Sequence, residues 1–92
     1  MFSSRSKTGR NNVIGLTIAR RRKELRISQR ELADRLNTIG LAIDKNAVQR
    51  LESGQRFVTD LEMLYLAQVF DVTLNDLYAD SKGEIDVPIK KK

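Results

Sequence analysis

Three short patterns, each a Ser or Thr followed three residues later by an acidic residue, constrain the fold of this chain most strongly. The pairs are Ser28 with Glu31, Thr59 with Glu62, and Thr73 with Asp76. In such a pattern the hydroxyl accepts a hydrogen bond from the third helical N–H, and the acid accepts one from the N–H of the capping residue. Each pattern therefore marks a helix start, and the sequence predicts helices that begin near residues 29, 60 and 74.

Two further helices are predicted from single caps. Asn12 can cap a first helix that runs to about Leu25, and Asp44 can cap a short helix that Gly54 closes in the left-handed conformation. Gly40 is the natural end of the helix that begins at residue 29. Five short helices with tight connections predict an all-α bundle.

The short helix after Asp44 has two different faces. Its apolar residues, Ala47, Val48 and Leu51, form one narrow stripe that we expect to pack inward. The opposite face carries Lys45, Asn46, Gln49, Arg50 and Ser53. Long polar side chains of this kind can contact base edges or phosphates, although an ordinary amphipathic surface helix has the same pattern.

Composition narrows the classes of protein. With 92 residues the chain forms one domain, and it has no cysteine and no histidine. A disulfide framework or zinc cluster is therefore not available, and the commonest general bases and transition-metal ligands are missing. We expect a protein that is not an enzyme and has no cofactor and no metal. No apolar run approaches the roughly 20 residues that span a bilayer, and the first residues lack a signal-peptide pattern, so we expect a cytoplasmic, nucleoid-associated protein with no membrane contact.

Charge is distributed unevenly along the chain. The net charge is +5, yet residues 57–80 contain five acidic residues and no Lys or Arg, whereas ten Lys or Arg residues lie between residues 13 and 56. This asymmetry suggests that one face turns toward a polyanion. Lysines in the tails can also serve solubility alone.

Three segments carry a family resemblance: residues 28–33 (SQRELA), 48–54 (VQRLESG) and 66–72 (LAQVFDV). In this order and spacing they resemble the Cro/lambda-repressor-like (XRE-type) helix-turn-helix DNA-binding domains over about Ile14 to Tyr78. The resemblance implies a five-helix lambda-repressor-like domain at residues 13–80. The Ser, Gly, Asn and basic residues before it predict a disordered basic arm at residues 1–12, and a tail follows at residues 81–92. The alternation of Ile85, Val87 and Ile89 leaves the tail either disordered or a strand paired with its twin in a dimer. One departure from the family is a longer connection between the second and third helices.

The resemblance also implies roles for individual residues. The helix at residues 45–53 would be the recognition helix, and a buried ion pair would join Arg22 to Glu52. Gln29 would hold a phosphate and brace the recognition helix. The expected base-contacting residues are Lys45, Asn46, Gln49 and Arg50. The expected phosphate-contacting residues are Gln29, Ser53, Arg56 and Thr59.

Two functional hypotheses remain open at this point. In the first, the protein is a sequence-specific transcriptional regulator, a repressor, that binds double-stranded DNA as a homodimer on an inverted-repeat operator. In the second, it is an antitoxin or adaptor whose main partner is another protein, a toxin or a regulator. Its partner surface would then include the fourth and fifth helices, with Leu74 and Tyr78 exposed.

Overall fold

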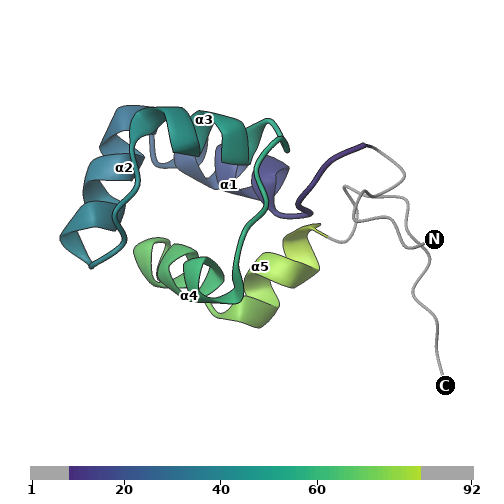
Figure 1. The fold of residues 1–92 in the computed structure, drawn as a ribbon. Coiled ribbons are helices and arrows are strands. Elements are labelled where there is room, and N and C mark those ends of the chain that lie inside the picture. Colours follow the sequence, from purple (N-terminus) through teal and green to yellow (C-terminus); the bar gives the residue numbers. More distant parts are fainter. Residues whose placement is uncertain (1–8, 82–92) are drawn as a thin grey trace, which may run out of the picture.

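The computed structural model describes residues 9–81, which form five α-helices (Figure 1). The helices are α1 (Gly15–Glu24), α2 (Gln29–Thr38), α3 (Lys45–Glu52), α4 (Asp60–Val69) and α5 (Leu74–Ser81). The prediction of an all-α, five-helix domain is confirmed.

Each of the three predicted capping patterns begins a helix. The Ser28 hydroxyl accepts a hydrogen bond from the Glu31 N–H at 3.0 Å, and the Glu31 carboxylate accepts one from the Ser28 N–H at 2.9 Å. The same reciprocal bonds join Thr59 to Glu62 and Thr73 to Asp76. At the start of α3, the Asp44 carboxylate accepts from the Ala47 N–H at 2.8 Å. These bonds satisfy N–H groups that have no partner inside a helix.

The first four helices end in the same way. A residue with positive φ follows each of them: Arg26 (φ 60°), Gly40 (φ 117°), Gly54 (φ 84°) and Asp71 (φ 56°). The N–H of the next residue then bonds the carbonyl five positions back, as Gln55 does to Arg50 at 2.9 Å. This is the Schellman ending, in which the left-handed residue reverses the chain and stops the helix. It explains how 73 described residues hold five helices with very short connections.

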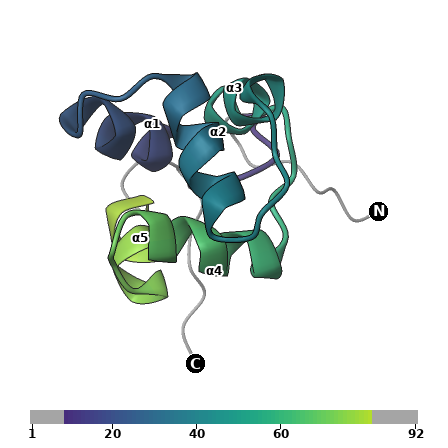
Figure 2. The same cartoon turned by 90° about the vertical axis from the view of Figure 1, so that its left-hand side faces the viewer.

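The helices pack in two groups. In Figures 1 and 2, α1, α2 and α3 lie on one side of the molecule and α4 and α5 on the other. α3 packs against α2 and α1, while α5 packs against α1 and α4. The largest side chains buried between them are Ile14, Ile18, Leu32, Leu36, Val48, Leu51, Leu66 and Leu77. Burial of such side chains contributes about 1.5–3 kcal/mol each before conformational entropy is subtracted.

The longer connection before α3 is held in place by an amide side chain. The Asn37 amide donates to the carbonyl of Ala33 at 2.7 Å and to that of Ile43 at 2.6 Å. Ile43 is buried and Leu41 is half-buried. The connection is therefore part of the packed structure, and it fixes the point at which α3 begins.

The predicted segment boundaries need correction at both ends. Arg10, Asn11 and Asn12 make hydrogen bonds to the chain around the end of α3, so the last part of the predicted arm is ordered. The N-cap position of α1 is Ile14, not Asn12 as predicted, and the Ile14 side chain makes no capping bond. Asn12, two residues earlier, still satisfies the first N–H of the helix, because its side-chain oxygen accepts from Gly15 at 2.7 Å. Ser81, placed in the tail, is the buried last residue of α5. The rest of the predicted arm and the predicted strand at residues 85–89 lie outside the described residues.

Candidate nucleic-acid interface

The short helix α3 has one buried and one exposed face. Ala47, Val48, Leu51 and Glu52 are buried. Lys45, Asn46, Gln49, Arg50 and Ser53 are exposed. The structure thus places all four predicted base-contacting residues on one exposed surface of a helix of about two turns. A helix of this size, with donors and acceptors on its free face, matches the dimensions of the DNA major groove.

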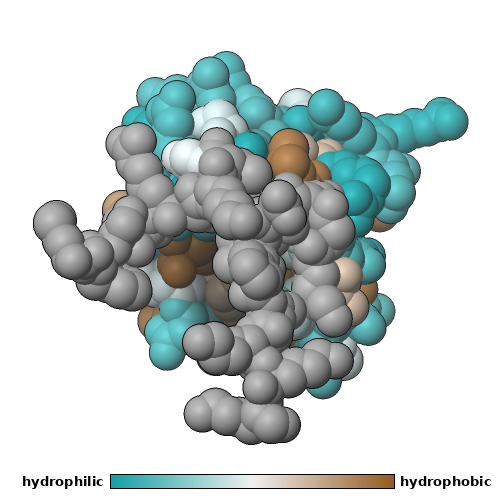
Figure 3. Space-filling view, turned by 90° about the vertical axis from the view of Figure 1, so that its right-hand side faces the viewer, coloured by the Kyte–Doolittle hydropathy of each residue, from teal (hydrophilic) through white to brown (hydrophobic). Residues whose placement is uncertain are grey.

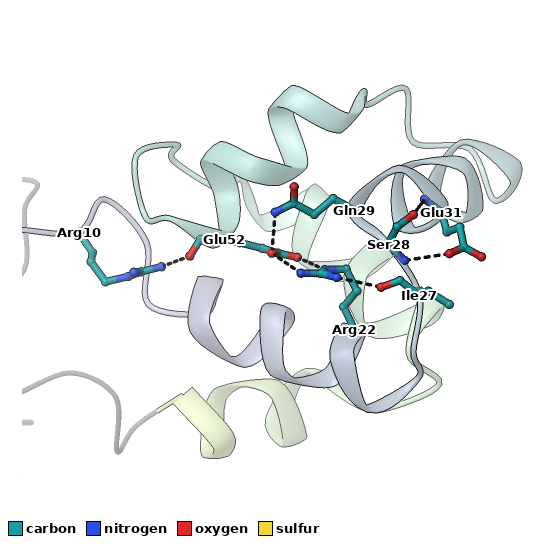
Figure 4. A network of polar contacts seen from close by, with 7 residues as sticks. All are labelled: Arg10, Arg22, Ile27, Ser28, Gln29, Glu31 and Glu52. Atoms are coloured by element: carbon teal, nitrogen blue, oxygen red, sulfur yellow. Dashed lines mark hydrogen bonds and ion pairs between the residues drawn. The ribbon is translucent and has the colours of Figure 1, made fainter.

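A single carboxylate joins α3 to the two helices behind it (Figure 4). Glu52, which is 8% exposed, accepts from Arg22 Nε at 2.7 Å and from Arg22 Nη2 at 3.1 Å. It also accepts from the Gln29 amide at 3.0 Å. The remaining terminal nitrogen of Arg22 donates to the Ile27 carbonyl at 2.8 Å. The ion pair implied by the family resemblance is present in the structure, and Gln29 braces α3 through it.

The predicted phosphate-contacting residues fall into separate groups. Gln29 belongs to the Glu52 group, and the exposed Ser53 hydroxyl bonds the Arg50 carbonyl at 3.2 Å. Arg56 and Thr59 both contact Glu62 at the start of α4. The four residues therefore do not share one hydrogen-bonding group.

Arg56 is engaged inside the protein by a pair that the sequence reading did not anticipate. Its two terminal nitrogens each donate to a carboxylate oxygen of Glu62 at 2.9 Å. This hydrogen bond lowers the pKa of Glu62 and raises the pKa of Arg56, while partial burial opposes both shifts. Two of the N–H groups at the start of α4 are already bonded within the protein. The Glu62 N–H donates to the Thr59 hydroxyl, and the Leu61 N–H donates to the Asp60 carboxylate at 2.8 Å. A phosphate here would compete with carboxylates.

A second missed set of contacts lies at the C-terminal end of α3. Arg10 donates to the Glu52 carbonyl at 2.7 Å (Figure 4), and Asn12 donates to the carbonyls of Leu51 at 3.0 Å and Arg56 at 2.8 Å. The only sequence signal for them was the pair of asparagines before α1, which we interpreted as a cap and part of a flexible arm.

The last two helices are acidic and contain no Lys or Arg. α4 and α5 carry Asp60, Glu62, Asp76 and Asp80. In Figure 1 these two helices lie below α3. Asp80 pairs with Arg21 and, at 3.9 Å, with Arg20, which ties α5 to α1. Figure 3 shows that the visible surface at the top of the molecule is mostly hydrophilic, with apolar side chains in small separate areas.

The fold and the exposed α3 define a class of protein: a small helical module that presents one short helix, packed across a second, to a ligand. A comparison with models of protein families matches residues 18–77 to the family described as Helix-turn-helix. The chain belongs to this XRE-type helix-turn-helix family and is a DNA-binding regulator of that type. The family is regulatory and typically non-enzymatic.

Two other comparisons, with the curated proteins and with the solved structures, gave no match. Within residues 9–81, none of the helices has the length and apolar character needed to cross a membrane. The same residues contain no cluster of acidic side chains that could hold a metal ion.

Proposed function

We propose that this protein is a sequence-specific transcriptional repressor that reads an inverted-repeat operator through α3. The observation that supports this most directly is the exposed face of α3. Lys45, Asn46, Gln49 and Arg50 all lie on it and are exposed. α3 enters the major groove with its N-terminal residues foremost.

The side chains on this face match different base edges. The amides of Asn46 and Gln49 suit the two major-groove groups of adenine, and the Arg50 guanidinium suits guanine. Each good bidentate pair supplies about 1–3 kcal/mol of discrimination against the wrong base. Lys45, at the first position of α3, can donate to a guanine or a phosphate.

Phosphate contacts set the orientation of α3 on the duplex. Gln29, next to α3 at the start of α2, and the exposed Ser53 hydroxyl are two candidates, and each also donates a hydrogen bond within the protein, to Glu52 and to the Arg50 carbonyl respectively. Arg56 and Thr59 would reach a phosphate only while they also contact Glu62, or after they release it.

The operator would be bound by two copies of the chain. One module of this size buries too little surface to bind specifically with high affinity by itself. A homodimer on two inverted half-sites about one DNA turn apart doubles that surface.

Selection from a random duplex library by the purified full chain tests this function. The selection is made at low salt and again near physiological salt, because non-specific binding by cationic side chains falls steeply as salt rises. Enrichment of an inverted repeat at both salt concentrations would support a dimeric operator-binding regulator. Binding that enriches no sequence and disappears at the higher salt would reject it.

An exposed apolar hollow favours a second candidate function, binding of a protein partner. Leu61, Leu64 and Leu74 are 57%, 53% and 40% exposed, and with Asp60 they line a hollow of about 440 Å³ on α4 and α5. A partner with an apolar segment flanked by basic residues would match this surface. The test is whether a protein that co-purifies with the chain, once purified itself, binds the wild type but not the Leu64→Asp variant.

A further inference from the structure

Residues 10–12 lie against the C-terminal end of α3 and bond its carbonyl groups. The last four carbonyls of any helix lack partners within that helix. In α3 the Gln49 carbonyl accepts from the Ser53 N–H, and the Arg50 carbonyl accepts from the Gln55 N–H. The Leu51 carbonyl accepts from the Gly54 N–H and also from the Asn12 amide, and the Glu52 carbonyl accepts from the Arg10 side chain. The segment before α1 thus completes the hydrogen bonding of α3.

The contacts continue into the loop after α3. The Asn11 N–H donates to the Gly54 carbonyl at 2.7 Å, and its amide donates to the Gln55 carbonyl at 2.9 Å. The second bond of the Asn12 amide goes to the Arg56 carbonyl at 2.8 Å. Three consecutive residues therefore bond five carbonyls between residues 51 and 56, and we name these three residues the N-terminal clamp.

Two glycines allow the backbone segments to come this close. A Cβ atom added to Gly15 would lie 2.3 Å from the Leu51 carbonyl oxygen, and one added to Gly54 would lie 2.7 Å from Arg10 Cζ. Both distances are far below van der Waals contact. The positive charge of Arg10 also interacts favourably with the negative, C-terminal end of the α3 dipole.

We propose that Arg10 and Asn12 are positioning residues for DNA recognition. Their bonds fix the C-terminal half of α3, which carries Gln49 and Arg50, so the base discrimination of those two side chains depends on a segment that itself contacts no base. This inference rests on the proposed function. The Glu52 network holds α3 from the α1 and α2 side, and the N-terminal clamp holds its end.

Asn12→Asp separates the two roles of Asn12. The aspartate retains an oxygen that can accept from the Gly15 N–H, but it loses both donors to Leu51 and Arg56. Arg10→Met removes the bond to the Glu52 carbonyl and the charge, and Arg10→Lys is its conservative counterpart. Thr73→Ala is the control, because it removes the cap of α5, a helix that packs mainly against α1 and α4.

The first measurement is amide hydrogen exchange on the full chain without DNA. We expect exchange at residues 53–56 to become about tenfold faster in Asn12→Asp, as for the loss of two ordinary hydrogen bonds, and unchanged in Thr73→Ala. Arg10→Met should give a smaller effect at the same amides, and Arg10→Lys should restore part of it. Equal exchange at these amides in Asn12→Asp and the control would overturn the positioning role.

The second measurement is the ratio of dissociation constants for the selected duplex and for the same duplex with one base pair of the half-site changed. The ratio should fall by about tenfold in Asn12→Asp, equivalent to loss of one bidentate base contact, and stay constant in Thr73→Ala. An unchanged ratio with faster exchange would show that the clamp stabilises α3 without affecting recognition, and would reject the proposal. If the wild type itself shows no discrimination, the proposed function fails, and the exchange data alone decide whether the clamp holds α3.

Discussion

Arg22 in α1 and Glu52 at the end of α3 bind each other through two hydrogen bonds, at 2.7 and 3.1 Å, across a separation of 30 residues in sequence. Their side chains are only 11% and 7% exposed. At this burial the carboxylate depends on its partners, because water cannot replace them.

Removal of Arg22 is therefore expected to destabilise the fold strongly. Arg22→Ala leaves Glu52 buried with the Gln29 amide as its main donor, and we expect a loss of about 3 kcal/mol in the free energy of unfolding. For a domain of this size the melting temperature should fall by more than about 10 °C. Thermal unfolding followed by circular dichroism measures the change.

A double substitution serves as the control for this prediction. Arg22→Met with Glu52→Leu removes both charges and keeps the volume, so it should recover most of the lost stability. Equal melting temperatures for the wild type and Arg22→Ala would show that the pair contributes nothing.

The Arg56–Glu62 pair predicts a pH dependence. Its hydrogen bonds hold the pKa of Glu62 below the usual value, so its stabilisation is complete above about pH 4.3 and is lost as the pH falls through the lower pKa of the folded protein. Glu62→Gln keeps a side chain that can still accept from the Thr59 N–H but removes the charge. At pH 7 the variant should be less stable by about 1 kcal/mol, and the difference should shrink below pH 4. Urea unfolding at several pH values tests this, and a difference that stays constant down to pH 3 would count against it.

Two helix endings leave room for stabilisation. Arg26 and Asp71 occupy the left-handed conformation without being glycine. Asp71→Gly should raise the free energy of unfolding by roughly 1 kcal/mol, because it removes both the backbone strain and a negative charge at the C-terminal end of α4. Arg26→Gly should raise it less, since it also removes a favourable positive charge from the end of α1.

Gly54→Ala, at the end of α3, should change the free energy of unfolding in the opposite direction. With φ at 84° and Arg10 in the space of the new Cβ, it should be destabilising. Denaturant midpoints of the three variants, measured together, test the order Asp71→Gly above Arg26→Gly above Gly54→Ala.

Base recognition by α3 can be tested at Gln49. Gln49→Ala should reduce discrimination at one position of the selected half-site by about tenfold and leave the salt dependence of binding unchanged, because the side chain is neutral. Gln68→Ala, at an exposed position on α4, is the matched control. A uniform loss of affinity over all duplexes would argue that Gln49 does not contact a base.

The fold could be predicted because its helix boundaries are encoded locally. Ser28 and Glu31 are three residues apart, and the bonds between them depend on nothing beyond that helical turn. The exposed face of α3 is likewise determined by the spacing of Val48 and Leu51. Such features need no knowledge of which segments meet in space.

The contacts that the sequence does not predict either join residues far apart in the chain or involve groups that no sequence pattern identifies. Asn12 bonds carbonyls 39 and 44 residues away, and a backbone carbonyl is the same group in every residue. An asparagine that binds such a group cannot be distinguished from one in a solvated segment. The resemblance gives Arg56 a phosphate-contacting role, and nothing in the sequence shows that Arg56 also pairs with Glu62, whose place in the capping pattern already accounts for it.

The separation of charge between the α3 side and the α4–α5 side gives the molecule an electric moment. Near a polyanion such a moment produces a torque that acts before any atom touches. A protein that approaches with its acidic helices first would be rotated until α3 leads, and a larger share of collisions would then become productive. The acidic residues of α4 and α5 would in this way speed the search for DNA that they never contact.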